Sequence, residues 1–319
     1  MAAYSLIVDG VNSQIPEALL DLLDTPGLTD ICIAENRTEL DFGQGLTPSE
    51  QFLITEPTLS DLAKELIELG GRRLDHSSPF ADVSLPGGIR VHAVLTSGCS
   101  PQTHISIRLH NTTEFNLESF LETASCSAQD AKSLQEISSS GDSFLIAGPT
   151  GSGKTTLLRA LLADQNQRII AIEDVTEIIG KNILNLQSKP KNIEGQGEIS
   201  LSDLVRESLR MRPDRLVIGE VRGKELLTML QALNTGHRGA TTLHANSLTH
   251  VPERLLSIAS AMNIPEQALA RLTVSAFDWV ISLGFEEGKR AVLGVGRPVL
   301  SELGFEVRRA PIPRRLALA

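Results

Sequence analysis

The sequence is poor in aromatic residues and carries no excess of positive charge. Aromatic residues make up 3% of the 319 residues, with one Trp and one Tyr, which leaves few side chains for stacking on nucleic-acid bases. The net charge is −10 at pH 7, and an acidic chain is repelled by the phosphates of DNA and RNA. We therefore expect no specific nucleic-acid partner.

Cysteines and long apolar runs are also scarce. Cys32, Cys99 and Cys126 are odd in number and widely spaced, so they fit neither a disulfide framework nor a zinc site, and we expect free, buried thiols. No run reaches the roughly 18 apolar residues of a membrane-spanning helix. The first dozen residues lack the charged start and apolar stretch of a signal peptide. A cytoplasmic protein is expected, with any membrane contact made through a partner.

The length and the order of patterns predict two domains. Residues 1–110 are expected to form a small α+β domain, and the polar residues 111–116 are the candidate linker. Residues 117–319 alternate strands and helices, which is typical of a parallel α/β sheet. The first domain is predicted to contain a helix at 59–69 and strands at 82–85, 90–95 and 104–109. The second is predicted to contain strands at 143–147, 169–172, 216–218 and 241–244, helices at 155–163, 203–211, 224–235, 251–262 and 266–277, and a closing hairpin of 279–283 with 291–295.

The motif GPTGSGKTT, residues 148–156, indicates a phosphate-binding loop, because it fits G-x-x-x-x-G-K-[ST] between an apolar strand and a helix. Glycines allow backbone N–H groups to surround phosphate oxygens, and the helix N-terminus adds positive charge. We expect Lys154 to bridge the β- and γ-phosphates of ATP and the Thr155 hydroxyl to bind Mg²⁺. The alternative, a glycine-rich turn with a solvated lysine, does not explain the flanking strand and helix. The predicted nucleotide-binding residues are Gly148, Pro149, Thr150, Gly151, Ser152, Gly153, Lys154, Thr155 and Thr156.

Acidic residues follow two of the predicted strands. Strands of a parallel sheet end at one edge, so these acids can converge on the γ-phosphate. Glu220 follows 216–218 with Gly219 between them, which favours Glu220 as the base that polarises water, while Thr155 and bound waters hold the metal. Glu220 could instead be a solvated cap residue. Glu173 is the second catalytic candidate, and the division of roles among Glu173, Asp174 and Glu177 stays open.

The motifs together resemble the secretion ATPase superfamily, which drives type II secretion, type IV secretion and type IV pilus assembly. The resemblance covers about residues 60–305 and is closest to the actinobacterial members of the Tad (Flp-type) pilus branch. Two departures are the missing long N-terminal extension of many Tad ATPases and the last dozen residues, which match no known segment. The residues that carry the resemblance are GGRRLDHSSPFADVSLPGGIRVHAVL (70–95), HISIRL (104–109), the phosphate loop, IAIEDVTEI (170–178), RMRPDRLVIGEVRG (210–223) and NTGHRGATTLHANS (234–247).

The resemblance implies a RecA-like P-loop NTPase core, a smaller α+β N-terminal domain, and a hexameric ring that hydrolyses ATP with Mg²⁺. Arg90 and Arg108 match the N-terminal arginines that reach the nucleotide phosphates. His237 and His244 match a histidine box with a γ-phosphate sensor or relay role, for which a metal ligand or a buried, hydrogen-bonded histidine are the alternatives. The remaining arginines, each a possible structural ion-pair partner, are Arg206, Arg210, Arg212 and Arg222.

These implications predict a cytoplasmic motor, docked at the inner face of the cytoplasmic membrane. It would move pilin subunits or a secreted substrate through an inner-membrane platform protein. Two other classes are weighed: a P-loop kinase for a small molecule, against which the histidine box and the separate N-terminal domain argue, and a nucleotide-binding scaffold without hydrolysis, against which intact Lys154, Thr155 and Glu220 argue.

Overall fold

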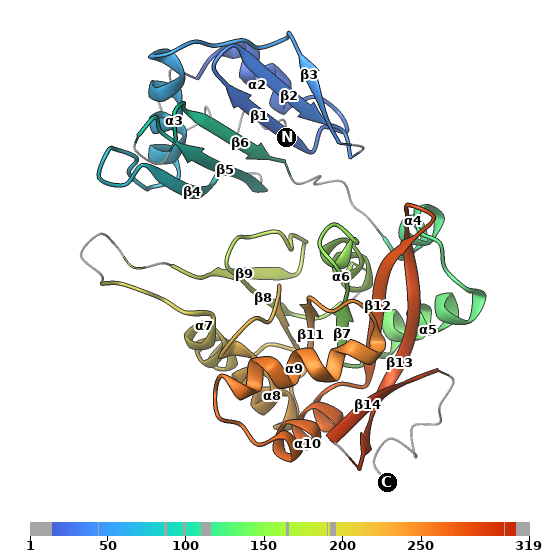
Figure 1. Cartoon of the computed structure of the whole chain (residues 1–319). Coiled ribbons are helices and arrows are strands. Elements are labelled where there is room, and N and C mark those ends of the chain that lie inside the picture. Colours follow the sequence, from blue (N-terminus) through green and yellow to red (C-terminus); the bar gives the residue numbers. More distant parts are fainter. Residues whose placement is uncertain are drawn as a thin grey trace. The chain divides into compact units, whose positions relative to one another are not determined.

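The computed structural model of the chain describes residues 15–43, 45–85, 88–97, 100–109, 116–163, 166–189, 191, 196–302 and 304–310. The chain divides into two compact units, Met1–Thr113 and Glu114–Ala319 (Figure 1). Of the predicted linker 111–116, all but Asn116 lies outside the described residues.

The first unit is an antiparallel sheet with two helices on one face. Its six strands lie in the order β3-β2-β1-β6-β5-β4. Buried residues alternate with half-buried ones along β1 and β5 and with exposed ones along β6, and the buried ones share a single core with the leucines of both helices. The elements are α2 (Glu17–Leu23), β1 (Asp30–Ala34), β2 (Arg37–Asp41), β3 (Leu46–Ser49), α3 (Thr58–Leu69), β4 (Phe80–Leu85), β5 (Ile89–Val94) and β6 (His104–Arg108).

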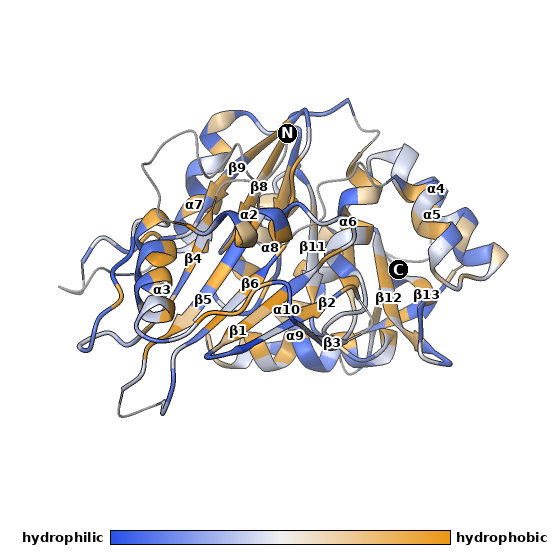
Figure 2. Ribbon diagram, turned by 90° about the horizontal axis from the view of Figure 1, so that it is seen from above, coloured by the Kyte–Doolittle hydropathy of each residue, from blue (hydrophilic) through white to orange (hydrophobic). Residues whose placement is uncertain are grey.

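Helix α3 forms where the leucine spacing predicted it. Leu59, Leu62 and Leu66 recur every three or four residues and are buried. Figure 2 shows the resulting hydrophobic and hydrophilic sides of the helix. The predicted strands correspond to β4, β5 and β6. Helix α2 and strands β1 to β3 were not predicted, because they are short and their turns carry weak sequence signals.

The second unit is built on an eight-stranded sheet in the order β14-β13-β12-β7-β11-β10-β8-β9. Strands β12, β7, β11, β10, β8 and β9 pair in parallel, and β13 and β14 add antiparallel strands at one edge. The strands are β7 (Phe144–Ala147), β8 (Ile169–Glu173), β9 (Ile183–Gln187), β10 (Arg215–Ile218), β11 (Arg238–Leu243), β12 (Trp279–Glu286), β13 (Lys289–Ser301) and β14 (Gly304–Arg309).

Helices cover both faces of this sheet, as the strand–helix alternation predicts. One face packs on α4, α5 and α6, and the other on α7, α8, α9 and α10, because the two sets of helices share separate cores with alternate strand residues. The helices are α4 (Leu117–Thr123), α5 (Ala128–Ser140), α6 (Lys154–Leu162), α7 (Leu201–Ser208), α8 (Glu225–Asn234), α9 (Val251–Ser260) and α10 (Glu266–Ala276), with 3-10 turns η2 (Leu209–Met211) and η3 (Leu248–His250).

The cysteine prediction needs one correction. Cys32 and Cys126 are free thiols, as expected, but both are only half-buried, whereas full burial was expected. Partial burial raises the pKa of Cys126 to about 11, so the thiol stays protonated at neutral pH. Cys99 lies outside the described residues.

We expect Gly70→Ala to destabilise the first unit. A Cβ at Gly70 would lie 2.2 Å from the Cβ of Val83 on β4, which cannot move without its strand. Forced overpacking of this kind costs about 1–3 kcal/mol. Gly71→Asn is the matched control, because nothing lies within 4 Å of a Cβ there and Asn tolerates its φ of +75°. Urea unfolding measures both. Equal stability of Gly70→Ala and wild type would contradict the contact between α3 and β4.

Candidate nucleotide site

The motif at 148–156 forms a tight loop between β7 and α6. Gly151 and Gly153 have φ values of +77° and +89°, which glycine adopts without strain. A Cβ on Gly148 would lie 2.5 Å from Ser152 Oγ and 2.9 Å from the Leu283 carbonyl oxygen. The strand–loop–helix arrangement predicted from sequence is therefore present, and the backbone turns too closely at Gly148 for any other residue.

The side chain of Lys154 folds back onto the backbone of this loop. Its side chain is 8% exposed, and Nζ donates hydrogen bonds of 2.9 Å to the carbonyl oxygens of Gly148 and Pro149. Nζ also lies 3.3 Å from His244 Nδ1. Burial lowers the pKa of Lys154, and the negative charge of Glu220 opposes that shift.

Glu220 lies two residues beyond the end of β10, and the side chains of Arg222 and His244 contact it. Arg222 Nη2 donates to its Oε2 at 2.6 Å, and His244 Nε2 lies 3.0 Å from its Oε1. The latter pair is close but poorly aligned, because Oε1 is buried and has no hydrogen bond. A buried acceptor without a partner costs free energy, so Oε1 is poised to accept from a water or ligand at this site.

His244 connects Lys154 to Glu220. It follows β11 and is half-buried. Burial lowers the pKa of His244, and the positive charge of Lys154 lowers it further, so the imidazole is neutral at pH 7. With Nδ1 accepting from Lys154, the proton of a neutral ring is on Nε2, on the side of Glu220.

Glu173 ends β8 and supports the neighbouring loop. Its Oε2 accepts the backbone N–H groups of Glu177 and Ile178, both at 3.1 Å. A Cβ on Gly219 would lie 2.9 Å from Glu173 Cγ, so the glycine makes room for this side chain. The negative charge of Glu173 also acts on Arg159 of α6. A direct catalytic role for Glu173 stays a prediction.

The two histidines of the histidine box lie apart. His237 precedes β11 and His244 follows it, so a strand of six residues, about 20 Å long, separates them. His237 Nδ1 lies 3.2 Å from the Ala232 carbonyl oxygen at the end of α8. The structure thus brings His244, and not His237, to the phosphate loop. Within the described residues, no group of three or more His, Cys, Asp or Glu side chains could hold a metal ion.

The N-terminal arginines lie directly opposite each other in the first unit. Arg90 of β5 pairs with Arg108 of β6, on the sheet face away from the helices. Arg108 Nε donates to Asp30 Oδ1 of β1 at 2.8 Å and is 60% exposed. Elsewhere, Arg206 pairs with Asp203, and Arg210 with Glu207, along α7 and η2.

Two residues beside the phosphate loop were not predicted from the sequence. Arg290 of β13 donates from Nε to the Gly151 carbonyl oxygen at 3.2 Å. The ring of Phe120 on α4 lies beside Gly153, with Cε2 3.9 Å from a Cβ built there. Neither residue belongs to a recognisable motif, and Arg290 is 139 residues from the loop. No local signal in the sequence could have identified them.

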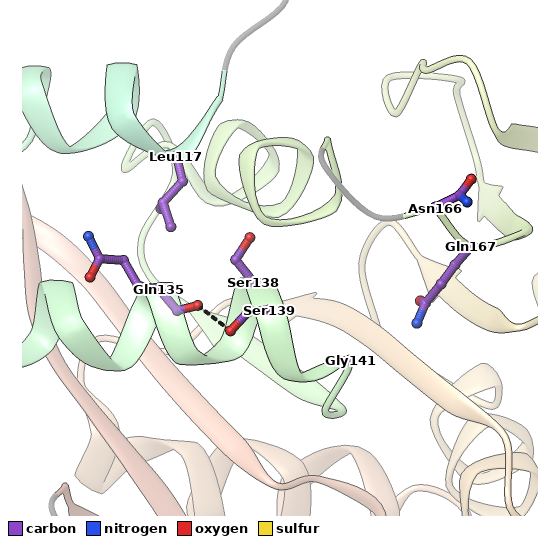
Figure 3. Close-up of a pocket in the computed structure, with 7 residues that line it drawn as sticks. All are labelled: Leu117, Gln135, Ser138, Ser139, Gly141, Asn166 and Gln167. Atoms are coloured by element: carbon purple, nitrogen blue, oxygen red, sulfur yellow. Dashed lines mark hydrogen bonds between the residues drawn. The ribbon is translucent and has the colours of Figure 1, made fainter.

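A separate hollow lies at the opposite end of the parallel strands, near the residues that precede β7 and β8. Its cavity volume is about 470 Å³, and five of the seven residues that line it have polar side chains (Figure 3). Ser139 Oγ donates to the Gln135 carbonyl oxygen at 3.0 Å. The lining residues are Leu117, Gln135, Ser138, Ser139, Gly141, Asn166 and Gln167. None of them contributes to the phosphate loop.

Comparisons with known proteins agree on one family. The family described as "Type II/IV secretion system protein" matches residues 52–281. A putative conjugal transfer protein of Mycobacterium tuberculosis is 36% identical over 260 residues, which cover 78% of this chain and 74% of that protein. The type IV secretion system protein PtlH homolog of Bordetella bronchiseptica is 29% identical over 309 residues, which cover 86% and 91%.

Solved structures show the same fold. The pilus retraction motor PilT with bound ADP matches with a TM-score of 0.64 at 20% identity, over 96% of this chain and 86% of that one. The ATPase DotB of Legionella pneumophila matches with a TM-score of 0.56 at 20% identity, over 85% and 77%. Among the described helices, none is long and apolar enough to cross a membrane.

We expect Lys154→Met to raise the pKa of His244 towards its ordinary value of about 6.5. The positive charge of Lys154 opposes protonation of the imidazole, so removing that charge favours the protonated form, while burial keeps part of the shift. A histidine NMR titration measures the pKa. Lys132→Met, on the exposed side of α5, is the control. An unchanged His244 titration in Lys154→Met would show that the two side chains are not coupled.

Proposed function

The chain belongs to the type II/IV secretion system protein family, and we propose that it is a ring-forming motor ATPase of a Tad-type pilus or a related secretion system. The fold is the α/β fold of the secretion ATPases, and the chain is an ATPase. The observation that supports ATP hydrolysis at the phosphate loop is the chain of contacts from Lys154 through His244 to Glu220.

The chemistry proposed is in-line attack of water on the γ-phosphate of ATP. The loop N–H groups and Lys154 bind the phosphates, and Lys154 neutralises the negative charge that builds up between the β- and γ-phosphates. Glu220 accepts the proton of the attacking water, since its Oε1 is buried without a hydrogen bond. His244, neutral between Lys154 and Glu220, lies beside that carboxylate and would respond to a phosphate in front of Lys154.

The residues present fit Mg²⁺ as the metal. Mg²⁺ is usually held by one or two protein oxygens together with phosphates and waters, and not by an all-protein cage. The described residues offer no such cage, while the hydroxyl of Thr155, half-buried at the start of α6, adjoins the phosphate-loop lysine. Thr155 would hold the ion, which would neutralise charge on the phosphate oxygens during hydrolysis.

Arg90 and Arg108 are proposed to complete the site from the N-terminal unit. A guanidinium offers paired donors that fit phosphate oxygens, and an arginine brought to a phosphoryl group accelerates its transfer. Both residues stand on the sheet face that the helices leave uncovered, and Arg108 is 60% exposed. Hydrolysis would then require the two units to close on ATP, which converts the chemical step into motion.

A homo-hexamer docked on an inner-membrane platform protein is the proposed assembly. Relatives carry the printed names of conjugal transfer and type IV secretion proteins, and a structural match is a pilus retraction motor. We propose a cytoplasmic position at the membrane, with pilin subunits or a secreted protein as the cargo. The resemblance of residues 210–223 and 234–247 to Tad ATPases supports the pilus among these.

We expect Glu220→Gln to bind ATP and to lose hydrolysis. The amide keeps the shape of the side chain but cannot accept the proton, so kcat should fall by about 10²–10⁴-fold without a comparable loss of affinity. Phosphate release and nucleotide binding are measured separately. Glu207→Gln, which removes an exposed carboxylate on α7, is the matched control. Normal hydrolysis by Glu220→Gln would move the base elsewhere, with Glu173 as the next candidate.

The ring proposal predicts that Arg108→Ala cuts hydrolysis by up to about a thousandfold, as loss of an arginine finger does. Arg37→Ala is the control, because Arg37 is equally exposed in the same sheet and pairs with Glu39 at 2.7 Å. The wild-type rate per subunit should also rise with protein concentration, since neighbours complete each site. A rate that stays flat through concentrations at which sizing shows monomers would rule out the ring mechanism.

A further inference from the structure

The carboxylate proposed as the base is restrained in the structure. Arg222 Nη2 donates to Glu220 Oε2 at 2.6 Å, the distance of a strong charge-assisted hydrogen bond. A donor at this distance fixes the carboxylate in its own direction. A base that must act on a water near the γ-phosphate is therefore held by a group from its own chain.

Arg222 combines a fixed main chain with an exposed tip. Its backbone N–H, like that of Gly223, donates to Oε1 of the buried Glu225 at the start of α8. The side chain is 63% exposed, so the guanidinium can reorient without disturbing any packing. The pivot of this side chain is rigid, and its charged end is free to change partner.

The guanidinium stands among the groups that surround the phosphate loop. It bonds to Glu220, which lies 3.0 Å from His244 Nε2, and His244 Nδ1 lies 3.3 Å from Lys154 Nζ. Burial is the main cause that lowers the pKa of Lys154 and of His244, and the charge of Arg222 adds to both shifts. In turn the hydrogen bond to Glu220, with the negative charges of Asp174 and Glu225, raises the pKa of Arg222. Its partners in the structure are carboxylates with one negative charge each, whereas the terminal phosphate of ATP offers more charge and three oxygens in fixed geometry.

We propose that Arg222 is a switch on the base: it holds Glu220 in the nucleotide-free subunit and transfers to the terminal phosphate when ATP binds. The hold keeps water from being activated before a γ-phosphate is present, and the transfer then frees Glu220 Oε2. The inference rests on the proposed role of Glu220 as the base. ADP lacks the terminal phosphate, so Arg222 stays on Glu220 when ADP is bound.

A double-mutant cycle on binding alone tests the switch, without any use of hydrolysis. Wild type, Glu220→Gln, Arg222→Gln and the double variant are titrated calorimetrically with the imido analogue of ATP and with ADP, at constant Mg²⁺. If the ion pair persists when nucleotide binds, its contribution cancels and the two substitutions act additively. If the pair breaks, the wild-type protein binds more weakly than the three variants predict.

We expect that deficit in affinity to be about fivefold or more for the ATP analogue, since side chains in direct contact couple on this scale. For ADP we expect a deficit within about twofold, because the ion pair persists. Simple repulsion between Glu220 and phosphate gives additive effects and so does not imitate the result. The control cycle uses Arg206→Gln in place of Arg222→Gln, because the ion pair of Arg206 with Asp203 lies on α7. Thermal unfolding of each variant verifies that it is folded.

Additive effects with the ATP analogue would overturn the proposal, because they would mean that Arg222 keeps the same partner throughout. Equal deficits with the analogue and with ADP would also overturn it, since the terminal phosphate would then not be the trigger. The base assignment is judged separately, by the hydrolysis rate of Glu220→Gln. A failure of the switch therefore cannot be mistaken for a failure of the base.

Discussion

The register of three parallel strands determines where the chemistry of this chain takes place. Ala147 pairs with Leu243, and Ile218 with Thr241, so β7, β10 and β11 end nearly level. Backbone hydrogen bonds extend the register past the strand ends, from the Gly148 N–H to the Leu243 carbonyl and from the Val221 N–H to the Thr242 carbonyl. A slip of one residue would turn each side chain to the other face of the sheet, and the phosphate loop, His244 and Glu220 would no longer meet.

Local patterns predicted what is decided locally. The phosphate loop, helix α3 and the parallel strands β7, β8, β10 and β11 have their own spacing or glycine requirements, and all were found where expected, whereas the parallel strand β9 was not predicted. Helix α5 was missed because its inner face includes the polar residues Asp130 and Ser133. Asp130 is buried because it accepts from the Val295 N–H and pairs with Arg309, and partners so distant in the chain leave no trace in a sequence window.

The candidate site divides in the same way. Residue type and spacing made Lys154 and Glu220 candidates, and the parallel topology explains why they lie at the same end of the strands. The spacing of His237 and His244 in the sequence did not show that they lie at opposite ends of β11. Seven residues in a helix span about half the length that they span in a strand, so the distance depends on the element between them. The partner of Arg222 was equally open, since an arginine near several acids can pair with any of them. Three-dimensional contacts decide such choices.

The short connection between α4 and α5 joins three parts of the second unit. Ser125 donates its N–H to the Arg290 carbonyl at 2.9 Å and accepts from the Val292 N–H at 2.8 Å, so the connection is bonded to β13 on both sides. The side chain of Arg290 in turn holds the Gly151 carbonyl of the phosphate loop. The segment that follows α4, the first described helix after the N-terminal unit, is therefore linked to the phosphate loop by three hydrogen bonds through a single strand, β13.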